Sequence, residues 1–284
     1  MSFDAGAHRE ASLAGWEEAA SGWVRRQVLL RELGAPVSHR MVQEIDPQPG
    51  QRVLELAAGL GETGMLAAEL VAPMGGVVIS DQAEAMLAGA RARAVELGLS
   101  NLEFQVLNAE WIDLPLASVD AVLCRWGYML MADPATALSE TRRVLRPGGR
   151  VALATWDAVE QNPWAHLPAQ ELAARRLGPT GGAAAGPGPF ALSSPERLTE
   201  LLEHAGFAEV HVEAIQLHRR HASFEELWET TLDLSRGFHD AVLSRPPAEV
   251  AAIRASLTER FAPFTAEDGT LGVPGRTLLA CASA

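Results

Sequence analysis

Cysteine is scarce in this chain of 284 residues, which contains only Cys124 and Cys281. Small secreted domains held by disulfides carry many more cysteines, and structural zinc sites usually recruit several thiolates. The scarcity therefore argues against a disulfide framework and a cysteine-rich metal site. The sequence also lacks an apolar run long enough to span a bilayer, and it lacks the basic-then-apolar start of a signal peptide. We expect a cytoplasmic protein that is not inserted in a membrane.

Basic residues are also few. The chain has 23 Lys and Arg residues against 36 Asp and Glu residues, so its formal net charge is −13 at pH 7. Such an acidic chain is poorly suited to bind a nucleic-acid backbone or an anionic membrane surface. A cationic or neutral small molecule is easier to accommodate. We therefore expect a small-molecule partner and no nucleic acid, while the oligomeric state is not readable from the sequence.

Apolar strand-like runs alternate with helix-like runs through the first half of the chain. Near-continuous apolar strands separated by helices indicate a parallel sheet that is covered on both faces. The runs predict strands at 51–57, 75–80, 101–107, 119–126 and 148–156, and helices at 62–71, 81–98 and 133–145. Asp133 is expected to cap the last of these helices, with Pro134 at its first position.

The segments on either side complete the predicted architecture. Apolar residues at helical spacing predict a helix that runs to Leu30, followed by a turn and a short helix at 34–45. After Trp156 we expect a helical excursion, a Gly- and Pro-rich loop at 178–190 that is either a lid or a linker, and further helices. Strands are expected at 207–218 and 276–283. The predicted fold class is α/β: a doubly wound, Rossmann-like, mostly parallel seven-stranded sheet with an antiparallel last strand, N-terminal helices and a helical cap.

A glycine-rich loop follows the first predicted strand. Its glycines, Gly59, Gly61 and Gly64, form G-x-G-x-x-G, a pattern that can cradle the pyrophosphate of a dinucleotide. Glu55 lies at the tip of the strand, however, and a pyrophosphate would be repelled by a carboxylate so close. A ligand with an ammonium and a sulfonium is compatible with that carboxylate. An NAD(P)-dependent oxidoreductase stays open at this point, because an acid after the second strand, here Asp81, also suits a dinucleotide.

The stretch 53–61, VLELAAGLG, resembles the first motif of class I S-adenosylmethionine-dependent methyltransferases. Ala57 stands where that family usually has its first glycine. Further matches are Asp81 after the second strand, NAEW at 108–111 after the third, the fourth-strand motif at 114–131, and Pro147-Gly148-Gly149 before the fifth strand. Taken together, their order and spacing are most similar to the type-11, ubiquinone/menaquinone-type small-molecule methyltransferases.

The resemblance implies S-adenosyl-L-methionine as the cofactor and S-adenosyl-L-homocysteine as the product. It implies that Asp81 accepts hydrogen bonds from the ribose, that Glu110 binds the adenine amino group, and that Trp111 packs on the adenine. The full set of cofactor-binding residues that we expect is Glu55, Ala57, Gly59, Gly61, Asp81, Gln82, Asn108, Ala109, Glu110, Trp111 and Arg125. The predicted domains are an N-terminal helical lid at 1–45, a cofactor-binding core at 46–157, and a cap with the remaining sheet strands at 158–284.

Three residues are candidates for a role in catalysis. Asp157 ends the fifth predicted strand, Tyr128 follows the fourth, and His166 lies in the helical excursion. A general base is needed only if the acceptor must lose a proton, so each of these residues has a structural alternative, as a helix cap, a core residue or a surface residue. We expect no metal site, because His211 and His218 point to opposite faces of a strand and Arg219 and Arg220 would repel a cation.

The acceptor is expected to be small and apolar or aromatic, because the helices that should line its pocket have a high apolar content. Trp16 and Trp23 lie one heptad apart on one helix face, where they serve either core packing or a lid over the pocket. The sequence thus predicts a methyltransferase. The alternatives are an NAD(P)-dependent oxidoreductase and a protein of the same fold that binds S-adenosylmethionine without transferring its methyl group.

Overall fold

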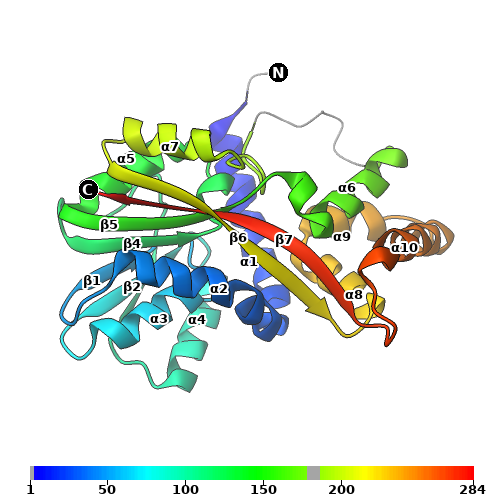
Figure 1. Ribbon diagram of the computed structural model, residues 1–284, viewed down its shortest axis with the longest axis horizontal. Coiled ribbons are helices and arrows are strands. Elements are labelled where there is room, and N and C mark those ends of the chain that lie inside the picture. The colour runs from blue at the N-terminus through cyan, green and yellow to red at the C-terminus, as the bar shows by residue number, and fades with distance from the viewer. Residues whose placement is uncertain (1–2, 178–185) are drawn as a thin grey trace. The chain divides into compact units, whose positions relative to one another are not determined.

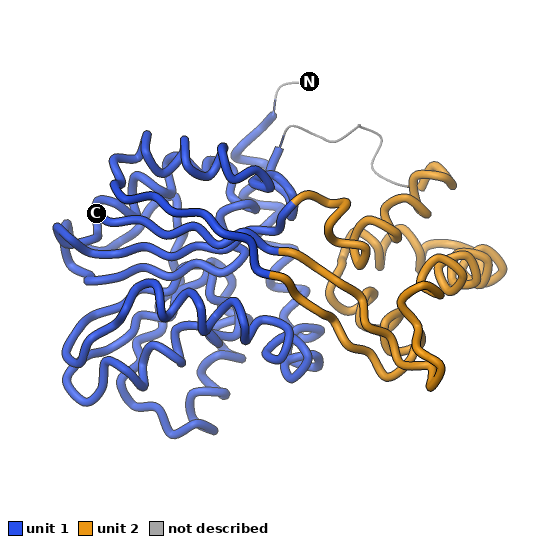
Figure 2. The backbone as a smooth tube through the Cα atoms, in the orientation of Figure 1, with its two compact units in different colours: residues 1–157, 186–215, 277–284 blue, residues 158–185, 216–276 orange. Residues whose placement is uncertain are grey.

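A computed structural model of the protein describes residues 3–177 and 186–284 (Figure 1). Most of the predicted lid-or-linker loop at 178–190 therefore lies outside the described residues. The chain divides into two compact units, drawn in different colours in Figure 2. The first unit contains residues 1–157, 186–215 and 277–284, and the second contains residues 158–185 and 216–276. The helices of residues 1–45 belong to the same unit as the glycine loop.

A seven-stranded sheet has the order β3-β2-β1-β4-β5-β7-β6. Its strands are β1 (Arg52–Glu55), β2 (Gly76–Asp81), β3 (Leu102–Val106), β4 (Val119–Arg125), β5 (Leu145–Trp156), β6 (Ala208–His221) and β7 (Leu271–Ser283). Strands β1 to β5 pair with one another in parallel, whereas β7 runs antiparallel to β5. The predicted mostly parallel sheet with an antiparallel last strand is confirmed. Strands β1, β2 and β4 are almost wholly buried, as near-continuous apolar runs require.

Helices flank the sheet in the first unit and form most of the second. The first unit contains α1 (Ala5–Arg25), α2 (Gln27–Ile45), α3 (Glu62–Val71), α4 (Glu84–Leu97), the 3₁₀ turn η1 (Tyr128–Leu130), α5 (Pro134–Val144) and α7 (Pro195–His204). The second contains η2 (Val159–Gln161), α6 (Pro163–Ala174), α8 (Phe224–Leu234), α9 (Arg236–Leu243), α10 (Pro247–Phe261) and η3 (Ala262–Phe264). The predicted cap of α5 is present, since the Asp133 carboxylate accepts a hydrogen bond from the Thr136 N–H.

The first two helices differ from the prediction. The first ends at Arg25, and α2 then continues through the expected turn, with Pro36 inside it. Proline removes one helical hydrogen bond, but Pro36 is exposed and the carbonyl that loses its partner belongs to Glu32, which is exposed as well. A buried apolar stripe that includes Leu33, Val37 and Met41 continues along α2 across this position. Burial of that stripe offsets the lost hydrogen bond, so the helix is not interrupted.

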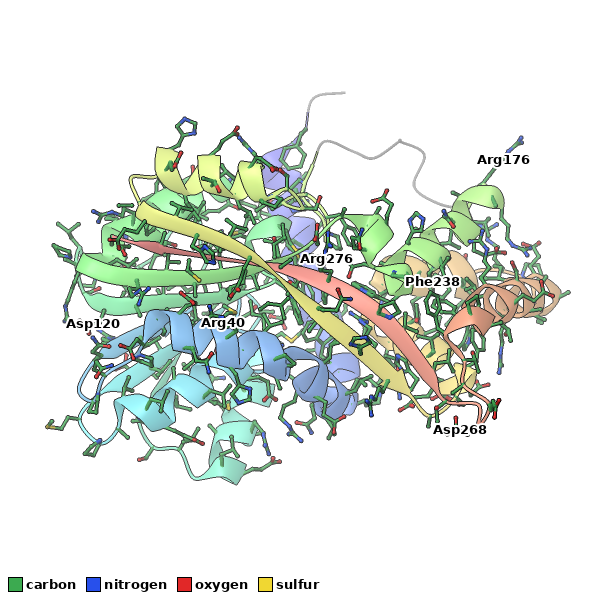
Figure 3. All side chains as sticks on the ribbon, viewed as in Figure 1. Arg40, Asp120, Arg176, Phe238, Asp268 and Arg276 are labelled. Atoms are coloured by element: carbon green, nitrogen blue, oxygen red, sulfur yellow. The ribbon has the colours of Figure 1, made fainter. Side chains whose placement is uncertain are left out.

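Polar side chains on the first unit, away from the carboxyl ends of β1, β2 and β4, connect structural elements to one another. Asp120 of β4 accepts a hydrogen bond from the Arg52 main-chain N–H at 2.7 Å and pairs with Arg146. Arg40 of α2 pairs with Glu213. Asp120 and Arg40 are labelled in Figure 3. These polar groups hold elements of the fold together, whereas the pocket described below lies at the carboxyl ends of β1, β2 and β4.

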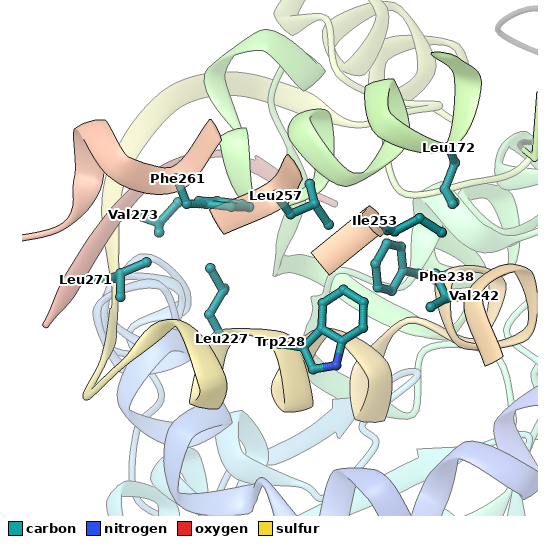
Figure 4. Packing of buried hydrophobic residues seen from close by; sticks show 10 residues of the cluster. All are labelled: Leu172, Leu227, Trp228, Phe238, Val242, Ile253, Leu257, Phe261, Leu271 and Val273. Atoms are coloured by element: carbon teal, nitrogen blue, oxygen red, sulfur yellow. The ribbon is translucent and has the colours of Figure 1, made fainter. Parts of the chain in front are cut away.

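The second unit has a hydrophobic core of its own (Figure 4). Trp228 and Phe238 meet edge to face with ring centroids 5.6 Å apart. The buried residues of this core come from α6, α8, α9, α10 and β7: Leu172, Leu227, Trp228, Phe238, Val242, Ile253, Leu257, Phe261, Leu271 and Val273. The predicted helical cap is therefore a compact unit. None of the helices in the described chain combines the length and apolar character that crossing a bilayer would need.

Candidate functional site

A pocket within the first unit lies at the carboxyl ends of β1, β2 and β4. It encloses about 960 Å³ of space that protein atoms do not fill, part of it open to solvent. Of the residues expected to bind a cofactor, the pocket is lined by Glu55, Ala57, Gly59, Asp81, Gln82, Asn108, Ala109, Glu110 and Arg125. Gly61 and Trp111 are outside its lining, and the Trp111 side chain is 77% exposed.

The segment 55–64 together with Asp81 forms one side of the pocket, which we call the floor. Three residues of the loop have left-handed backbone conformations: Ala57 (φ 48°), Gly59 (φ 55°) and Gly61 (φ 78°). Glycine adopts this conformation freely, whereas alanine does so at a cost of about 1 kcal/mol. Ala57 thus adopts the left-handed conformation that glycine usually provides at this position of the motif. Gly61 then caps the start of α3.

Glu55 is fully buried beneath the loop. Its Oε2 accepts a hydrogen bond from the Gly64 N–H at 2.9 Å. A Cβ at Gly64 would lie only 2.6 Å from that oxygen, so the carboxylate can approach only because residue 64 is glycine. Burial raises the pKa of Glu55 to about 7, although the Gly64 N–H and the Arg125 charge oppose the rise. A cationic ligand beside this group would favour its ionised form.

Asp81, at the end of β2, connects the loop to the start of α4. Its Oδ2 accepts a hydrogen bond from the Gly59 N–H at 2.8 Å, and its Oδ1 accepts one from the Ala83 N–H at 3.0 Å. The side chain is buried, and burial raises its pKa against these two hydrogen bonds. Each carboxylate oxygen has a second lone pair, so Asp81 can accept further hydrogen bonds from a ligand.

Helix α1 forms the opposite side of the pocket, which we call the roof. Arg9 donates to Oε2 of Glu110 from Nε at 3.0 Å and also from Nη2. His8 Nε2 lies 2.9 Å from the Leu130 carbonyl oxygen. The Glu17 carboxylate accepts hydrogen bonds from two main-chain N–H groups at the start of α4, at 2.7 and 3.1 Å. That helix has no side-chain cap of its own. The roof is therefore attached to α4 and to the segments that follow β3 and β4.

Glu110 has both oxygens engaged. Oε2 accepts from Arg9, and Oε1 accepts from the Ala132 N–H at 2.9 Å. The sequence prediction identified the carboxylate but missed its partner in α1. The spacing of seven residues between Arg9, Trp16 and Trp23 does place Arg9 on the tryptophan face of the helix, but it does not identify Glu110 as its partner.

Tryptophans supply the aromatic part of the pocket. Trp16 and Trp23 of the roof meet edge to face with ring centroids 5.3 Å apart. Trp126, just after β4, has a left-handed backbone (φ 62°) and stacks on Trp156 at 4.3 Å. Its indole N–H donates to Thr277 Oγ1 at 2.9 Å. The stacking on Trp156 and the hydrogen bond to Thr277 fix the orientation of the Trp126 ring, which is part of the pocket wall.

None of the three candidate catalytic residues lines this pocket. Tyr128 is fully buried, with its hydroxyl 2.6 Å from Thr141 Oγ1, and burial raises the pKa of the phenol. This is the core alternative that the sequence left open. Asp157 is buried at the end of β5. His166 belongs to the second unit, where its Nε2 lies 2.7 Å from Gln170 Nε2. Within residues 3–177 and 186–284, no group of three or more His, Cys, Asp or Glu side chains could hold a metal ion.

Comparisons with known proteins agree with this geometry. The sequence family described as "Methyltransferase domain" matches residues 47–206. Aklanonic acid methyltransferase of Streptomyces sp. (strain C5) is 35% identical over 121 residues, which are 43% of this chain and 55% of that protein. Nocamycin O-methyltransferase of Saccharothrix syringae is 30% identical over 257 residues, covering 86% of this chain and 92% of the relative.

Among solved structures, the YcgJ protein of Bacillus subtilis is similar in fold, with a TM-score of 0.55 and 21% identity over 87% of this chain and 97% of that one. The chain spans little more than half the length of the first curated relatives that it matches, 55% and 56%.

Proposed function

This chain belongs to the methyltransferase domain family, and on that premise we propose that it is an S-adenosylmethionine-dependent methyltransferase that acts on a small apolar or aromatic acceptor. The observation that carries the proposal is one pocket with two different sides. On one side lie the loop with left-handed backbone conformations and the buried carboxylates, and on the other lie the tryptophans of the roof. Three carboxylates in its lining, Glu55, Asp81 and Glu110, would repel a pyrophosphate. They suit a ligand that carries positive charge and no phosphate.

We propose the following roles for the floor. Glu55 binds the cofactor's ammonium group, which favours the ionised carboxylate despite its burial. Asp81 holds Gly59 in place and accepts hydrogen bonds from the ribose hydroxyls through its remaining lone pairs. Glu110 lies beside the adenine, with Arg9 and the Ala132 N–H fixing its orientation. When bound, S-adenosylmethionine supplies a methyl group on a sulfonium, an electrophile that needs no metal.

For the acceptor, we propose that the tryptophan surfaces matter most. Trp16 and Trp23 of the roof line the pocket, and flat aromatic rings stack well on other flat rings. The chain's own contribution to the reaction is then to align the acceptor and to exclude water beneath the roof. We also propose that α1, within the predicted lid at 1–45, covers the bound ligands. The roles of Asp157, His166 and Trp111, and of residues 158–284 as an acceptor wall, stay predictions.

Calorimetry with S-adenosylhomocysteine and NADH tests the cofactor. We expect S-adenosylhomocysteine to bind with a dissociation constant in the micromolar range or lower and NADH not to bind. Binding of NADH alone would contradict the proposal and support an oxidoreductase. Mass spectrometry then follows S-adenosylhomocysteine formation with a panel of polycyclic phenols and a panel of aliphatic alcohols and amines. Turnover with the aromatic panel is the expected result, and binding without turnover of any acceptor would favour a protein that does not transfer the methyl group.

A matched pair of variants in α1 tests the acceptor class. Trp16→Ala removes an indole that lines the pocket, whereas Leu13→Ala shortens an exposed side chain of the same helix that is outside the lining. We expect KM for the best aromatic acceptor to rise about tenfold in Trp16→Ala and to stay unchanged in Leu13→Ala. Equal KM values in the two variants would contradict an acceptor site beneath the roof.

A further inference from the structure

Trp126 follows the last residue of β4 and has a left-handed backbone conformation, with φ 62°. A bulky side chain rarely adopts this conformation, whereas glycine adopts it without strain. Residues that keep such strain are concentrated at functional sites, because contacts of the side chain have to offset its cost. A tryptophan at a position that suits glycine therefore points to a role for the indole.

The backbone on both sides of Trp126 is held in place. Its main-chain N–H donates to the Ala154 carbonyl of β5 at 2.8 Å. The next residue packs against the glycine-rich loop, since a Cβ at Gly127 would lie 2.6 Å from the Cβ of Ala57. The chain thus has to turn sharply at Trp126, between β5 and the loop, and the left-handed conformation makes that turn.

Contacts from three strands fix the indole of Trp126. It stacks on Trp156 of β5 with an interplanar angle of 15°, and the Arg125 guanidinium carbon of β4 lies 4.8 Å from its centroid. Its N–H donates to Thr277 Oγ1 of β7. That hydroxyl donates its own proton to the Thr155 carbonyl at 2.5 Å, so it acts as an acceptor toward the indole. The ring is therefore a rigid part of the pocket wall.

Trp126 belongs to the half of the pocket that the expected cofactor site leaves free. Strands β2 and β3 lie on one side of β1, and β4 and β5 lie on the other (Figure 1). Apart from Arg125, the residues expected to bind the cofactor lie at or after the ends of β1, β2 and β3. Ligands of such sheets bind where the strand order reverses. The β4 side is then the acceptor side, and the indole is its boundary toward β5 and β7.

We propose that Trp126 is a specificity-determining residue, whose fixed indole limits how far an acceptor can extend toward β5. This inference rests on the proposed function. A ring that cannot turn away excludes every acceptor group that would overlap it, which is selection by steric exclusion. The acceptors that fit are aromatic molecules without a bulky substituent on the side that faces the indole.

The test uses the phenol that the wild type methylates best and its derivatives with one tert-butyl group at each ring position. For each derivative, kcat/KM is divided by that of the parent phenol, and this ratio is compared between proteins, so that intrinsic reactivity cancels. In Trp126→Ala we expect the ratio of at least one derivative to rise about tenfold, while the dissociation constant of S-adenosylhomocysteine changes less than about threefold. Thermal melting verifies that the variant is folded.

A second variant keeps the indole and loosens it. Thr277→Val removes the acceptor of the indole N–H, although Thr277 itself is outside the pocket lining. We expect the ratio of the same derivative to rise about threefold. Thr141→Val is the matched control, since it removes another buried hydroxyl that bonds to an aromatic side chain, Tyr128, outside the lining. It should lower thermal stability and leave every ratio unchanged.

The outcomes that overturn the inference are distinct from failure of the proposed function. Equal loss of kcat/KM for the parent phenol and all derivatives in Trp126→Ala would show that the indole only packs. Weaker binding of S-adenosylhomocysteine with unchanged ratios would place the indole at the cofactor. If Trp126→Ala does not fold, unchanged ratios in Thr277→Val overturn the inference. If the wild type methylates no acceptor, the proposed function itself is wrong.

Discussion

The floor and the roof of the pocket are held together in different ways. In the floor, Glu55 and Asp81 bond to main-chain N–H groups of the loop and of the following helix, Gly64, Gly59 and Ala83. In the roof, Arg9 bonds to Glu110, a residue 101 positions further along the chain. The floor therefore depends on the local path of the chain between strands. The roof depends on a few polar contacts between distant segments.

The difference in construction implies a difference in energetic weight. Floor hydrogen bonds are buried and involve charged groups, which contribute about 1.5–3 kcal/mol each. The roof's main ion pair is partly exposed, since the Arg9 side chain is 40% accessible, and exposed ion pairs contribute about 1 kcal/mol or less. Substitutions in the floor should therefore abolish or strongly reduce ligand affinity, whereas substitutions in the roof should reduce it only modestly.

The largest effect is expected for Asp81→Ala. The variant leaves the buried N–H groups of Gly59 and Ala83 without their acceptor and removes the proposed ribose acceptor. We expect the dissociation constant of S-adenosylhomocysteine to rise about 100-fold or more. Calorimetry against Asp113→Ala, which changes an exposed aspartate outside the pocket, provides the control. An affinity equal to that of the control would show that the floor carries no special weight.

Glu55→Gln tests the buried carboxyl of the floor through the pH dependence of stability. The pKa of Glu55 is about 7 in the folded chain against 4.5 for an unperturbed glutamate, so between these values the folded state keeps a proton that the unfolded state has lost. Its contribution to stability is therefore present below about pH 4.5 and is lost as the pH rises to about 7. Glutamine does not titrate.

The wild type should therefore lose stability relative to Glu55→Gln as the pH rises from about 5 to about 8. The difference in the free energy of unfolding, variant minus wild type, should increase by on the order of 3 kcal/mol over this range. Urea unfolding of the ligand-free proteins at several pH values measures this gain. A constant difference between the two proteins over that range would mean that Glu55 ionises normally.

In the roof, Arg9→Ala should have a smaller effect. It removes the ion pair with Glu110 but leaves the contacts of Glu17 and His8 in place. We expect the dissociation constant of S-adenosylhomocysteine to rise about threefold to tenfold, with little change in thermal stability. Glu10→Ala, at the adjacent exposed position of α1, should bind like the wild type. A loss as large as that of Asp81→Ala would remove the distinction between floor and roof.

The smallest effect concerns the loop itself. Ala57→Gly relieves the left-handed strain at residue 57, so the variant should be more stable than the wild type by about 0.5–1 kcal/mol. Ala58→Gly, at the next position, has no positive φ to relieve and should be less stable by about 1 kcal/mol. Thermal unfolding of the two variants gives both differences, and equal destabilisation would show that Ala57 is not strained.

The position of the floor residues could be predicted from the sequence because the signals are local, whereas their roles toward a ligand stay predictions. Gly59 of the glycine motif, Glu55 at the strand tip and Asp81 at the end of the next strand follow directly from the order of strands and loops, and all three line one pocket. The parallel sheet was predictable for the same reason, since each strand is an apolar run between turn residues. The family resemblance is confirmed by the match over residues 47–206.

The roof was less predictable because its contacts join residues far apart in the chain. Nothing near Arg9 identifies Glu110 as its partner, and the helical pattern alone did not show that α1 ends at Arg25. The exposure of Trp111 was not predictable from its apolar side chain either, and its proposed contact with the adenine stays a prediction. The compact second unit was expected only as a cap, because its core forms from helices that are amphipathic one by one.

The position of β7 has a consequence for how the protein is made. The strand lies between β5 and β6 although it follows both along the chain. During synthesis, the edge of β5 that later pairs with β7 stays unpaired until residues 157–270 have been made and β7 follows. An unpaired apolar edge strand invites association with other chains. Expression should therefore respond to chaperone supply, and a ribosome stalled before β7 should release an aggregation-prone product.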